Sequence, residues 1–319
     1  MKRKIFIIEE YEIEKQTRVQ QLISKIVQEG DINLLLRLKY YHTPLTSKLI
    51  DSIADTIKNV GKEQEFVVDI VLETDQWRNI KALHRKLNQY AISIELKVSD
   101  GLKTKEIIRY KDKLLLEKLL VACEDYTTFH QAFHRWKETG LSIDTVDYEL
   151  AHKEYLDFFE EWIHDAKATW FIPFEDIISS MLTGISSGNC EYSSCMGKYL
   201  YLDKNDQVYF CAKKREHTQM YSLGEAMPES LYNEVYERAL SMVIAKRNPC
   251  VENCQLFHLC RGGCAFLEKK PEVCEEYAKK ISRMEDFIRK EIENAFADIE
   301  NPCMRQLYLS FIAYGFRFQ

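Results

Sequence analysis

The sequence predicts an α/β protein, namely a partial (β/α) barrel followed by a small cysteine-rich α+β domain. Two observations predict this fold class. Apolar runs with strand character alternate with stretches of helical periodicity in the first half of the chain, and eight of the ten cysteines fall between Cys190 and Cys274. At 319 residues and 46% hydrophobic content, the chain is long enough to bury at least one sizeable core.

The alternation of strands and helices is clearest before residue 100. Runs of aliphatic and β-branched residues alternate with amphipathic stretches, which is typical of βαβ units in a mostly parallel sheet. In chain order we expect strand, helix, strand, helix and strand at residues 33–40, 45–57, 66–73, 76–87 and 91–98. Two further helices are expected at 126–139 and 150–164.

The second half of the chain predicts a β-hairpin followed by helices. Residues 198–202 and 208–211 are expected to be strands around the turn Lys204-Asn205-Asp206, because Asn and Asp tolerate turn conformations. Helices are expected at 231–246 and 275–297, and a strand in the aromatic tail 308–318. We therefore predict an α/β domain at 1–185, a cysteine-rich domain at 186–280, and a C-terminal helix and strand at 281–319.

Composition and charge exclude several classes of function. A net charge of −6 and a pI near 5.9 argue against a nucleic-acid partner. No apolar run approaches the length of a membrane span, and the one after the basic start is too short for a secretory signal. We expect a cytoplasmic protein with no membrane partner. Gly30 and Gly61 are the only glycines in the first hundred residues, so no glycine-rich phosphate loop is present there.

The cysteine cluster is the strongest functional signal. Its members, in chain order, are Cys190, Cys195, Cys211, Cys250, Cys254, Cys260, Cys264 and Cys274. Eight thiols complete two four-thiolate sites, and soft thiolates select zinc, copper(I) or iron-sulfur clusters. In a reducing cytoplasm such a cluster indicates metal binding rather than disulfides. Coordination alone leaves iron-sulfur clusters and paired structural zinc ions both open.

The residues around these cysteines resemble the SPASM domain, which follows the barrel in many radical SAM peptide-modifying enzymes. The resemblance lies in Cys260-Arg-Gly-Gly-Cys264, in the five residues between Cys254 and Cys260, and in the hairpin that leads to Cys211. Two features depart from the family pattern. Asp206 stands where a glycine is expected, five residues ahead of Cys211, and three residues instead of two separate Cys250 from Cys254. Neither departure removes a ligand.

The resemblance implies two auxiliary 4Fe-4S clusters. One would be held by Cys190, Cys195, Cys211 and Cys264, and the other by Cys250, Cys254, Cys260 and Cys274. Because the two ligand sets interleave along the chain, the metals would be part of the fold as well as of its chemistry. We therefore expect the metal-free protein to be unstable.

Two hallmarks of cofactor binding in the radical SAM family are missing from this chain. The family holds its catalytic cluster on a C-x3-C-x2-C loop after the first barrel strand, whereas the segment after residues 33–40 reads Tyr41-His-Thr-Pro-Leu45. A glycine-rich turn follows the second strand in the family, whereas Leu72-Glu-Thr-Asp-Gln-Trp77 contains no glycine. The resemblance is thus to a degenerate radical SAM-like barrel, for which we expect no S-adenosylmethionine.

Three other candidate positions have structural interpretations. His130 and His134 are four residues apart, a spacing that metals use on one helix face, but their aromatic neighbours favour an ordinary helix face. Cys123 lies in an apolar run and is expected to pack as a small hydrophobic residue. Cys303 is expected to be an unligated thiol, because the eight earlier cysteines complete the ligand count.

These observations predict an iron-sulfur protein that does not generate radicals on its own. We expect it to serve the maturation of a ribosomally made peptide, either by relaying electrons to a catalytic radical SAM protein or by presenting the precursor peptide. The alternative is a structural or peptide-binding protein with two zinc sites. A third interpretation, an enzyme acting through an open iron, requires one of the eight cysteines to be unligated.

Overall fold

The structure is a computed structural model of the 319-residue chain. It describes residues 2–9, 16–28, 32–40, 45–60, 66–73, 76–90, 92–98, 102–146, 150–183, 199–211, 218–223, 225, 237, 241, 271–294, 300–306 and 309. The chain divides into two compact units. The first comprises residues 1–118 and 195–245, and the second comprises residues 119–194 and 246–319. Each unit therefore combines two separate stretches of the sequence.

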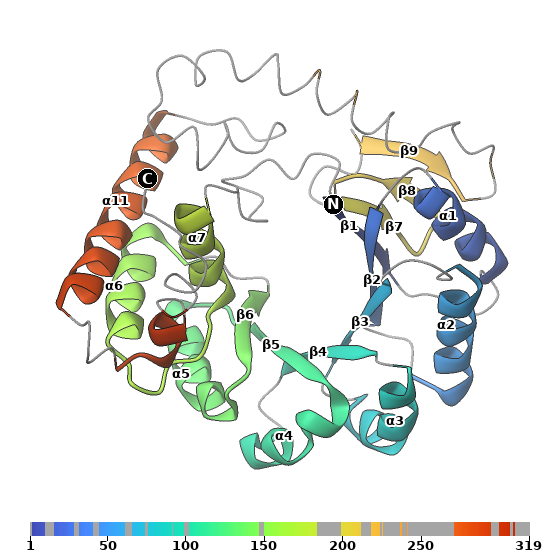
Figure 1. The fold of residues 1–319 in the computed structure, drawn as a ribbon, viewed down its shortest axis with the longest axis horizontal. Helices are drawn as coiled ribbons and strands as arrows, with labels where there is room; N and C mark the ends of the chain where they lie inside the picture. Colours follow the sequence, from blue (N-terminus) through green and yellow to red (C-terminus); the bar gives the residue numbers. More distant parts are fainter. Residues whose placement is uncertain are drawn as a thin grey trace. The chain divides into compact units, whose positions relative to one another are not determined.

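Four parallel strands form the centre of the first unit (Figure 1). They pair in chain order and are β1 (Lys2–Glu9), β2 (Ile32–Tyr40), β3 (Phe66–Glu73) and β4 (Ser93–Val98). The helices of this unit are α1 (Gln16–Gln28), α2 (Ser47–Val60), α3 (Trp77–Gln89) and α4 (Thr104–Tyr110), with a 3-10 helix at Asp112–Leu114. Parallel strands need such crossover connections, and Figure 1 shows α1, α2 and α3 on one side of the strands.

A single row of aliphatic side chains crosses all four parallel strands. Ile8 pairs with Leu38, Leu38 with Ile70, and Ile70 with Ile94. Each of the four is at most 2% exposed, and full burial of such a side chain contributes about 1.5–3 kcal/mol. Successive side chains of a strand point to opposite faces, so this row fixes which residues face the other side of the sheet.

An antiparallel extension widens the sheet of the first unit. β7 (Tyr199–Leu202) pairs in parallel with β1, and β8 (Gln207–Tyr209) and β9 (Gln219–Ser222) follow in antiparallel orientation. The strand order within this unit is β4-β3-β2-β1-β7-β8-β9. The predicted hairpin is therefore confirmed, and it is joined directly to the first strand of the parallel sheet.

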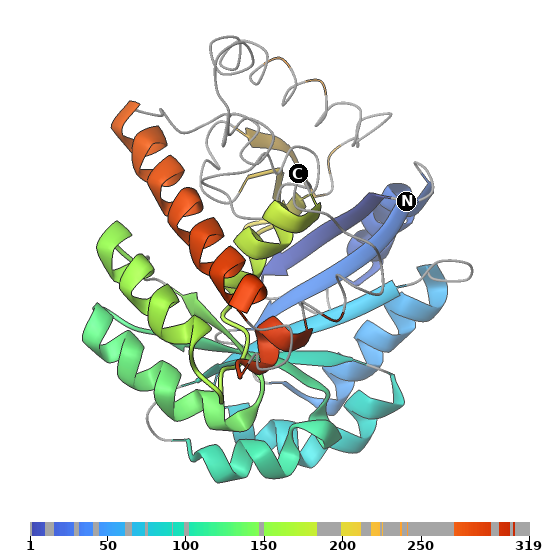
Figure 2. The same ribbon diagram turned by 60° about the vertical axis from the view of Figure 1, so that its left-hand side comes forward.

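The second unit is mainly helical. β5 (Leu116–Ala122) begins at the end of the first unit and runs into the second, where β6 (Ser142–Val146) is next to it in the strand order. The helices are α5 (Tyr126–Trp136), a 3-10 helix at Lys137–Thr139, α6 (His152–Ile163), α7 (Ile172–Thr183) and α11 (Pro271–Asn294). Figure 2 shows α6 and α11 side by side, and the two helices are in contact.

An aromatic core holds the helices of the second unit together. Its members, each at most 1% exposed, are Phe129, Phe133, Phe158, Trp162, Phe171 and Phe174. The ring of Phe158 meets Phe129 at 5.0 Å and Phe133 at 4.8 Å between centroids, both edge to face. Such pairs add about 0.5–1.5 kcal/mol each beyond the burial of their area. The core therefore fixes α5 against α6.

The mixed α/β fold class predicted from the sequence is confirmed, with a large parallel sheet and crossover helices. All five elements predicted before residue 100 are present, and so are the helices predicted around residues 126–139, 150–164 and 275–297. The elements that were not predicted are β1, α1, α4, β5, β6, α7 and β9. Cys123 is buried, as expected.

Two predicted elements lie largely outside the described residues. Only residues 237 and 241 of the predicted helix 231–246, and only residue 309 of the predicted tail strand 308–318, are described, and all three are helical. The domain boundaries near residues 185 and 280 stay a prediction. Within the described part of the chain, no helix is both long and apolar enough to span a membrane.

Candidate functional site

The turn between β7 and β8 is built by the carboxylate of Asp203. Its Oδ1 accepts hydrogen bonds from the backbone N–H groups of Asn205 at 2.9 Å and Gln207 at 3.0 Å. The backbone N–H of Asp206 donates to the carbonyl of Asp203 at 3.1 Å. This is the mechanism by which Asx residues specify turns, so the sequence fixes the hairpin locally.

Asp206 adopts the left-handed conformation that glycine favours. Its φ is +64°, one of two positive φ values among the described non-glycine residues. Left-handed backbone is costly for most L-residues, and Asp is one of the few that tolerate it. The SPASM pattern has glycine at this position, and Asp206 meets the same backbone requirement.

Cys211 is held at the end of this hairpin. Cys211 is 5% exposed, and its backbone carbonyl accepts a hydrogen bond from Thr218 Oγ1 at 3.2 Å. The neighbouring Phe210 donates its N–H to the carbonyl of Thr218 at 3.3 Å, immediately before β9 begins. The backbone of the predicted ligand is thus tied to both β8 and β9.

Cys274 is the other predicted ligand that the structure describes. It is the fourth residue of α11 and is half-buried. A helix N-terminus favours negative charge, which suits a thiolate ligand. Neither Cys211 nor Cys274 is in a disulfide within the described part of the chain, so both thiols can serve as ligands.

The other six predicted ligands lie outside the described residues. They are Cys190, Cys195, Cys250, Cys254, Cys260 and Cys264. Cys211 and Cys274 belong to different predicted ligand sets, so the described residues include one member of each set. The division of the eight cysteines into two clusters therefore stays a prediction.

The strand at residues 33–40 was predicted to be the first of the sheet, and the segment after it was compared with the catalytic-cluster loop; this prediction was wrong. The first strand of the parallel sheet is β1, not the strand at residues 33–40, because Phe6, Ile7 and Ile8 are buried in the sheet. The segment after the first strand is therefore 10–15, Glu-Tyr-Glu-Ile-Glu-Lys, and the segment after the second strand begins Tyr41-His-Thr-Pro. Neither segment contains a cysteine or a glycine, and 10–15 and 41–44 lie outside the described residues.

A charged cluster that was not predicted from the sequence lies on the sheet of the first unit. Glu95 Oε1 accepts a hydrogen bond from Arg37 Nη2 at 2.6 Å and lies 3.3 Å from Lys118 Nζ. The Glu95 side chain is only 4% exposed, and a buried carboxylate requires such partners. The sequence signal that could have revealed this cluster is a charged residue within each of three apolar strands, namely Arg37 in β2, Glu95 in β4 and Lys118 in β5.

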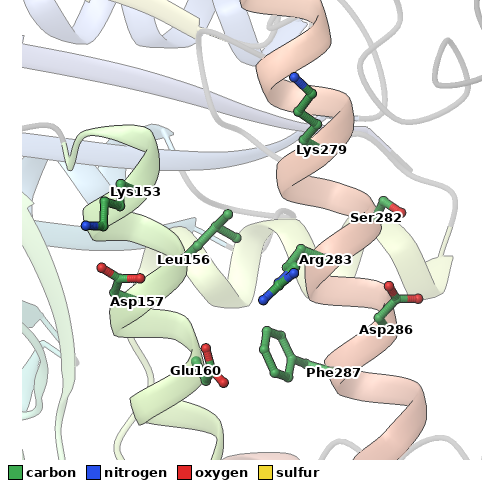
Figure 3. Close-up of a pocket in the computed structure, with 9 residues that line it drawn as sticks. All are labelled: Lys153, Leu156, Asp157, Glu160, Lys279, Ser282, Arg283, Asp286 and Phe287. Carbon is green, nitrogen blue, oxygen red and sulfur yellow. The ribbon is translucent and has the colours of Figure 1, made fainter.

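A groove separates α6 from α11 in the second unit (Figure 3). It encloses about 500 Å³ and is lined by Lys153, Leu156, Asp157, Glu160, Lys279, Ser282, Arg283, Asp286 and Phe287. Figure 3 shows Arg283 and Phe287 reaching from α11 toward α6. The lining carries three cationic and three anionic side chains and none of the predicted cysteine ligands. The groove therefore favours neither a cationic nor an anionic ligand.

The chain is similar to solved structures of anSMEcpe, an anaerobic sulfatase-maturating radical SAM enzyme with a SPASM domain. With bound AdoMet and the Cp18Cys peptide, that structure has a TM-score of 0.66 at 12% identity, covering 92% of this chain and 99% of that one. The structure with AdoMet alone has a TM-score of 0.63 at 12% identity, and the match covers 92% of this chain and 100% of that one. The structure with AdoMet and the Kp18Cys peptide has a TM-score of 0.61 at 13% identity, and the match covers 92% of this chain and 99% of that one. No protein-family profile and no curated protein matches the chain.

An identity of 12–13% shows the fold alone. The match nevertheless extends over 92% of this chain and 99% of the similar one. The chain therefore has a radical SAM/SPASM-like α/β fold.

Proposed function

We propose that this chain is an iron-sulfur protein that binds two auxiliary 4Fe-4S clusters through its SPASM-like segment, residues 186–280. In this proposal it serves the maturation of a ribosomally made peptide as a partner of a catalytic radical SAM enzyme. One observation carries the proposal: the hairpin that ends at Cys211 has its left-handed residue, Asp206, five positions ahead of the cysteine. That is the position of the glycine in the SPASM pattern.

The described ligands suit the clusters chemically. Cys211 is buried beside an antiparallel strand pair, where water has little access to a bound cluster. Cys274 stands in the first turn of α11, where backbone N–H groups favour negative charge. When bound, a 4Fe-4S cluster supplies one-electron redox chemistry. The ligand sets we propose are Cys190, Cys195, Cys211 and Cys264 for one cluster, and Cys250, Cys254, Cys260 and Cys274 for the other.

The partner role rests on the segments after β1 and β2. Residues 10–15 and 41–45 contain no cysteine, so the chain offers no thiol for a catalytic cluster at either place. The similar structures contain AdoMet and, in two cases, a peptide. The peptide supports a precursor peptide as ligand of this chain. AdoMet binding must be measured directly, because our expectation that the chain does not bind it rests on the sequence alone.

The decisive experiment is anaerobic purification followed by measurement of iron, acid-labile sulfide and zinc per chain. We expect about eight iron and eight sulfide, with a visible absorption band that dithionite bleaches. Cys211→Ser and Cys274→Ser should each lose about half of the iron, because each removes a ligand of a different cluster. Cys303→Ser is the matched control and should keep the wild-type content. About two zinc ions without sulfide would replace this proposal with the structural zinc protein.

Two further measurements test the partner role. The clustered protein is incubated with AdoMet and dithionite, and 5′-deoxyadenosine is quantified. Its formation by the isolated chain would overturn the partner role and leave the cluster assignment intact. Electron relay would be overturned separately if the iron-sulfur absorption and electron paramagnetic resonance signals did not change between oxidised and reduced protein.

A further inference from the structure

Two histidines on α5 and one glutamate on α6 bring their ligand atoms together in the second unit. His130 Nε2 lies 2.7 Å from Glu161 Oε2, and His134 Nε2 lies 2.7 Å from Glu161 Oε1. The two Nε2 atoms are 3.1 Å apart. His130 and His134 are one helical turn apart, so both rings project from the same face of α5. Glu161 comes from a different helix, 31 residues beyond His130.

These distances match the spacing of ligands around one metal ion. With metal–nitrogen and metal–oxygen bonds of about 2.1 Å, adjacent ligands lie roughly 3.0 Å apart in an octahedron and roughly 3.4 Å apart in a tetrahedron. The separations of 2.7, 2.7 and 3.1 Å, of which the first two run to the two different oxygens of Glu161, are close to the octahedral edge. One ligand atom from each of the three residues lies within 4.8 Å of those from the other two.

The chemistry of the three groups is that of a zinc-type site. Imidazole and carboxylate together suit Zn²⁺ and the neighbouring divalent ions Co²⁺ and Ni²⁺. In the metal-free protein each imidazole can donate its Nε2–H to one oxygen of Glu161. On metal binding the ring proton moves from Nε2 to Nδ1, which frees the Nε2 lone pair without a net release of protons.

The aromatic core restrains the two histidine rings. The ring of His130 lies 5.6 Å from that of Tyr126 and 6.1 Å from that of Phe158, and the ring of His134 lies 6.0 Å from that of Phe133. Both histidine side chains are 33% exposed and the Glu161 side chain is 43% exposed. One side of the cluster is therefore fixed by the core, and the other is open to water and to an incoming ion.

We propose that His130, His134 and Glu161 bind one divalent ion of the zinc type and thereby join α5 to α6. With three protein ligands, the remaining coordination positions are open to water. This site is independent of the cysteine clusters and uses none of their ligands. In this proposal His130 and His134 are ligands and not an ordinary helix face, and the sequence alone could not show that Glu161 faces them.

The test is a titration of the anaerobically purified, cluster-loaded full chain with Co²⁺ and, separately, with Zn²⁺. Wild-type protein should bind one Co²⁺ with a weak visible spectrum of nitrogen and oxygen ligation and without the intense near-ultraviolet band of cobalt–thiolate ligation. Zn²⁺ should compete for the same site and raise the thermal midpoint of the chain. His134→Ala and Glu161→Gln should weaken Co²⁺ binding at least about 10- to 100-fold and abolish the rise in midpoint.

Glu160→Gln is the matched control, because Glu160 is adjacent on α6 but lines the groove toward α11. It should bind Co²⁺ like the wild type. The proposal is overturned if His134→Ala and Glu161→Gln bind Co²⁺ as tightly as the wild type, or if the bound Co²⁺ shows thiolate ligation. The iron and sulfide content of all three variants should equal that of the wild type. This measurement distinguishes a failure of the proposed histidine–glutamate metal site from a failure of the iron-sulfur cluster assignment.

Discussion

Arg37 Nη2 donates to Glu95 Oε1 at 2.6 Å and so connects β2 to β4 across the intervening strand β3. Lys118 Nζ approaches the same oxygen at 3.3 Å. Because the Glu95 carboxylate is buried, its replacement removes a close negative charge from two partly buried cations, Arg37 and Lys118. We expect Glu95→Gln to lower the free energy of unfolding by about 3 kcal/mol, measured by urea denaturation.

The control for this prediction is Glu106→Gln. Glu106 pairs with Lys81 at 3.6 Å, and its side chain is 44% exposed. An exposed pair of this kind contributes at most about 1 kcal/mol. Equal losses of stability in the two variants would mean that the buried cluster does not carry the stability we assign to it.

The left-handed conformation of Asp206 predicts opposite outcomes for two substitutions. Asp206→Ala should destabilise the chain by about 1 kcal/mol, because alanine has no side-chain oxygen and pays the full cost of a positive φ. Asp206→Gly should stay within about 0.5 kcal/mol of the wild type, because glycine adopts this conformation freely. Thermal unfolding measures both, with Lys204→Ala in the exposed part of the turn as control. Equal behaviour of the Ala and Gly variants would contradict the argument.

The ion pair between Lys137 and Asp165 predicts a pH-dependent stability. Burial alone would raise the pKa of Asp165, but the hydrogen bonds from Lys137 and from the backbone of Lys167, together with the charge of Lys137, hold that pKa below its usual value. A carboxylate with a lowered folded-state pKa stabilises the protein above its unfolded pKa, and this contribution is lost as the pH falls through the folded pKa.

Asp165→Asn should therefore lower the free energy of unfolding by about 1 kcal/mol at pH 7. The difference from the wild type should shrink toward zero as the pH falls below about 4, the usual pKa of Asp. Chemical denaturation at a series of pH values measures this difference, with the exposed Asp112→Asn as control. A difference that is constant down to the lowest pH would show that the charge of Asp165 is not responsible.

Cys303 should be unreactive in the folded protein. Burial raises the pKa of its thiol to about 12, with the charges of Glu175 and Asp165 adding to the effect, and its Sγ donates to the carbonyl of Ala168 at 3.7 Å. Because the thiolate is the nucleophile, iodoacetamide at pH 8 should leave Cys303 unmodified, as read by peptide mass spectrometry. The same residue in urea-denatured protein is the control. Equal labelling in the two states would contradict the burial of this thiol.

The order of strands and helices could be predicted because each element carries its own periodicity. The runs at 33–40 and 66–73 are rich in apolar residues, and Asn205 and Asp206 indicate the hairpin turn. β1 was missed because Lys2, Arg3 and Lys4 precede its buried residues, so that only four apolar residues stand together. β5 was missed for a similar reason, since Glu117 and Lys118 interrupt its apolar pattern.

The candidate sites could be predicted only where their members are close in sequence. The cysteine spacings predict eight ligands, an assignment that stays a prediction, and Cys211 lies at the end of the predicted hairpin. Glu161 is 31 residues from His130 and on another helix, and Glu95 is 58 residues from Arg37. Such pairs are created by helix packing and strand register, which a single sequence does not specify.

The pairing of β7 with β1 has a consequence for synthesis on the ribosome. One edge of β1 is occupied by β2 soon after the chain emerges, but its other edge acquires a partner only when residues 199–202 have been made. The second unit also needs residues beyond 246, including α11. Neither unit can therefore finish folding before these distant residues have been made, and pairing between such distant segments is slow. For roughly two hundred residues of translation, the nascent chain exposes a strand edge that a chaperone, or another nascent chain, could occupy first.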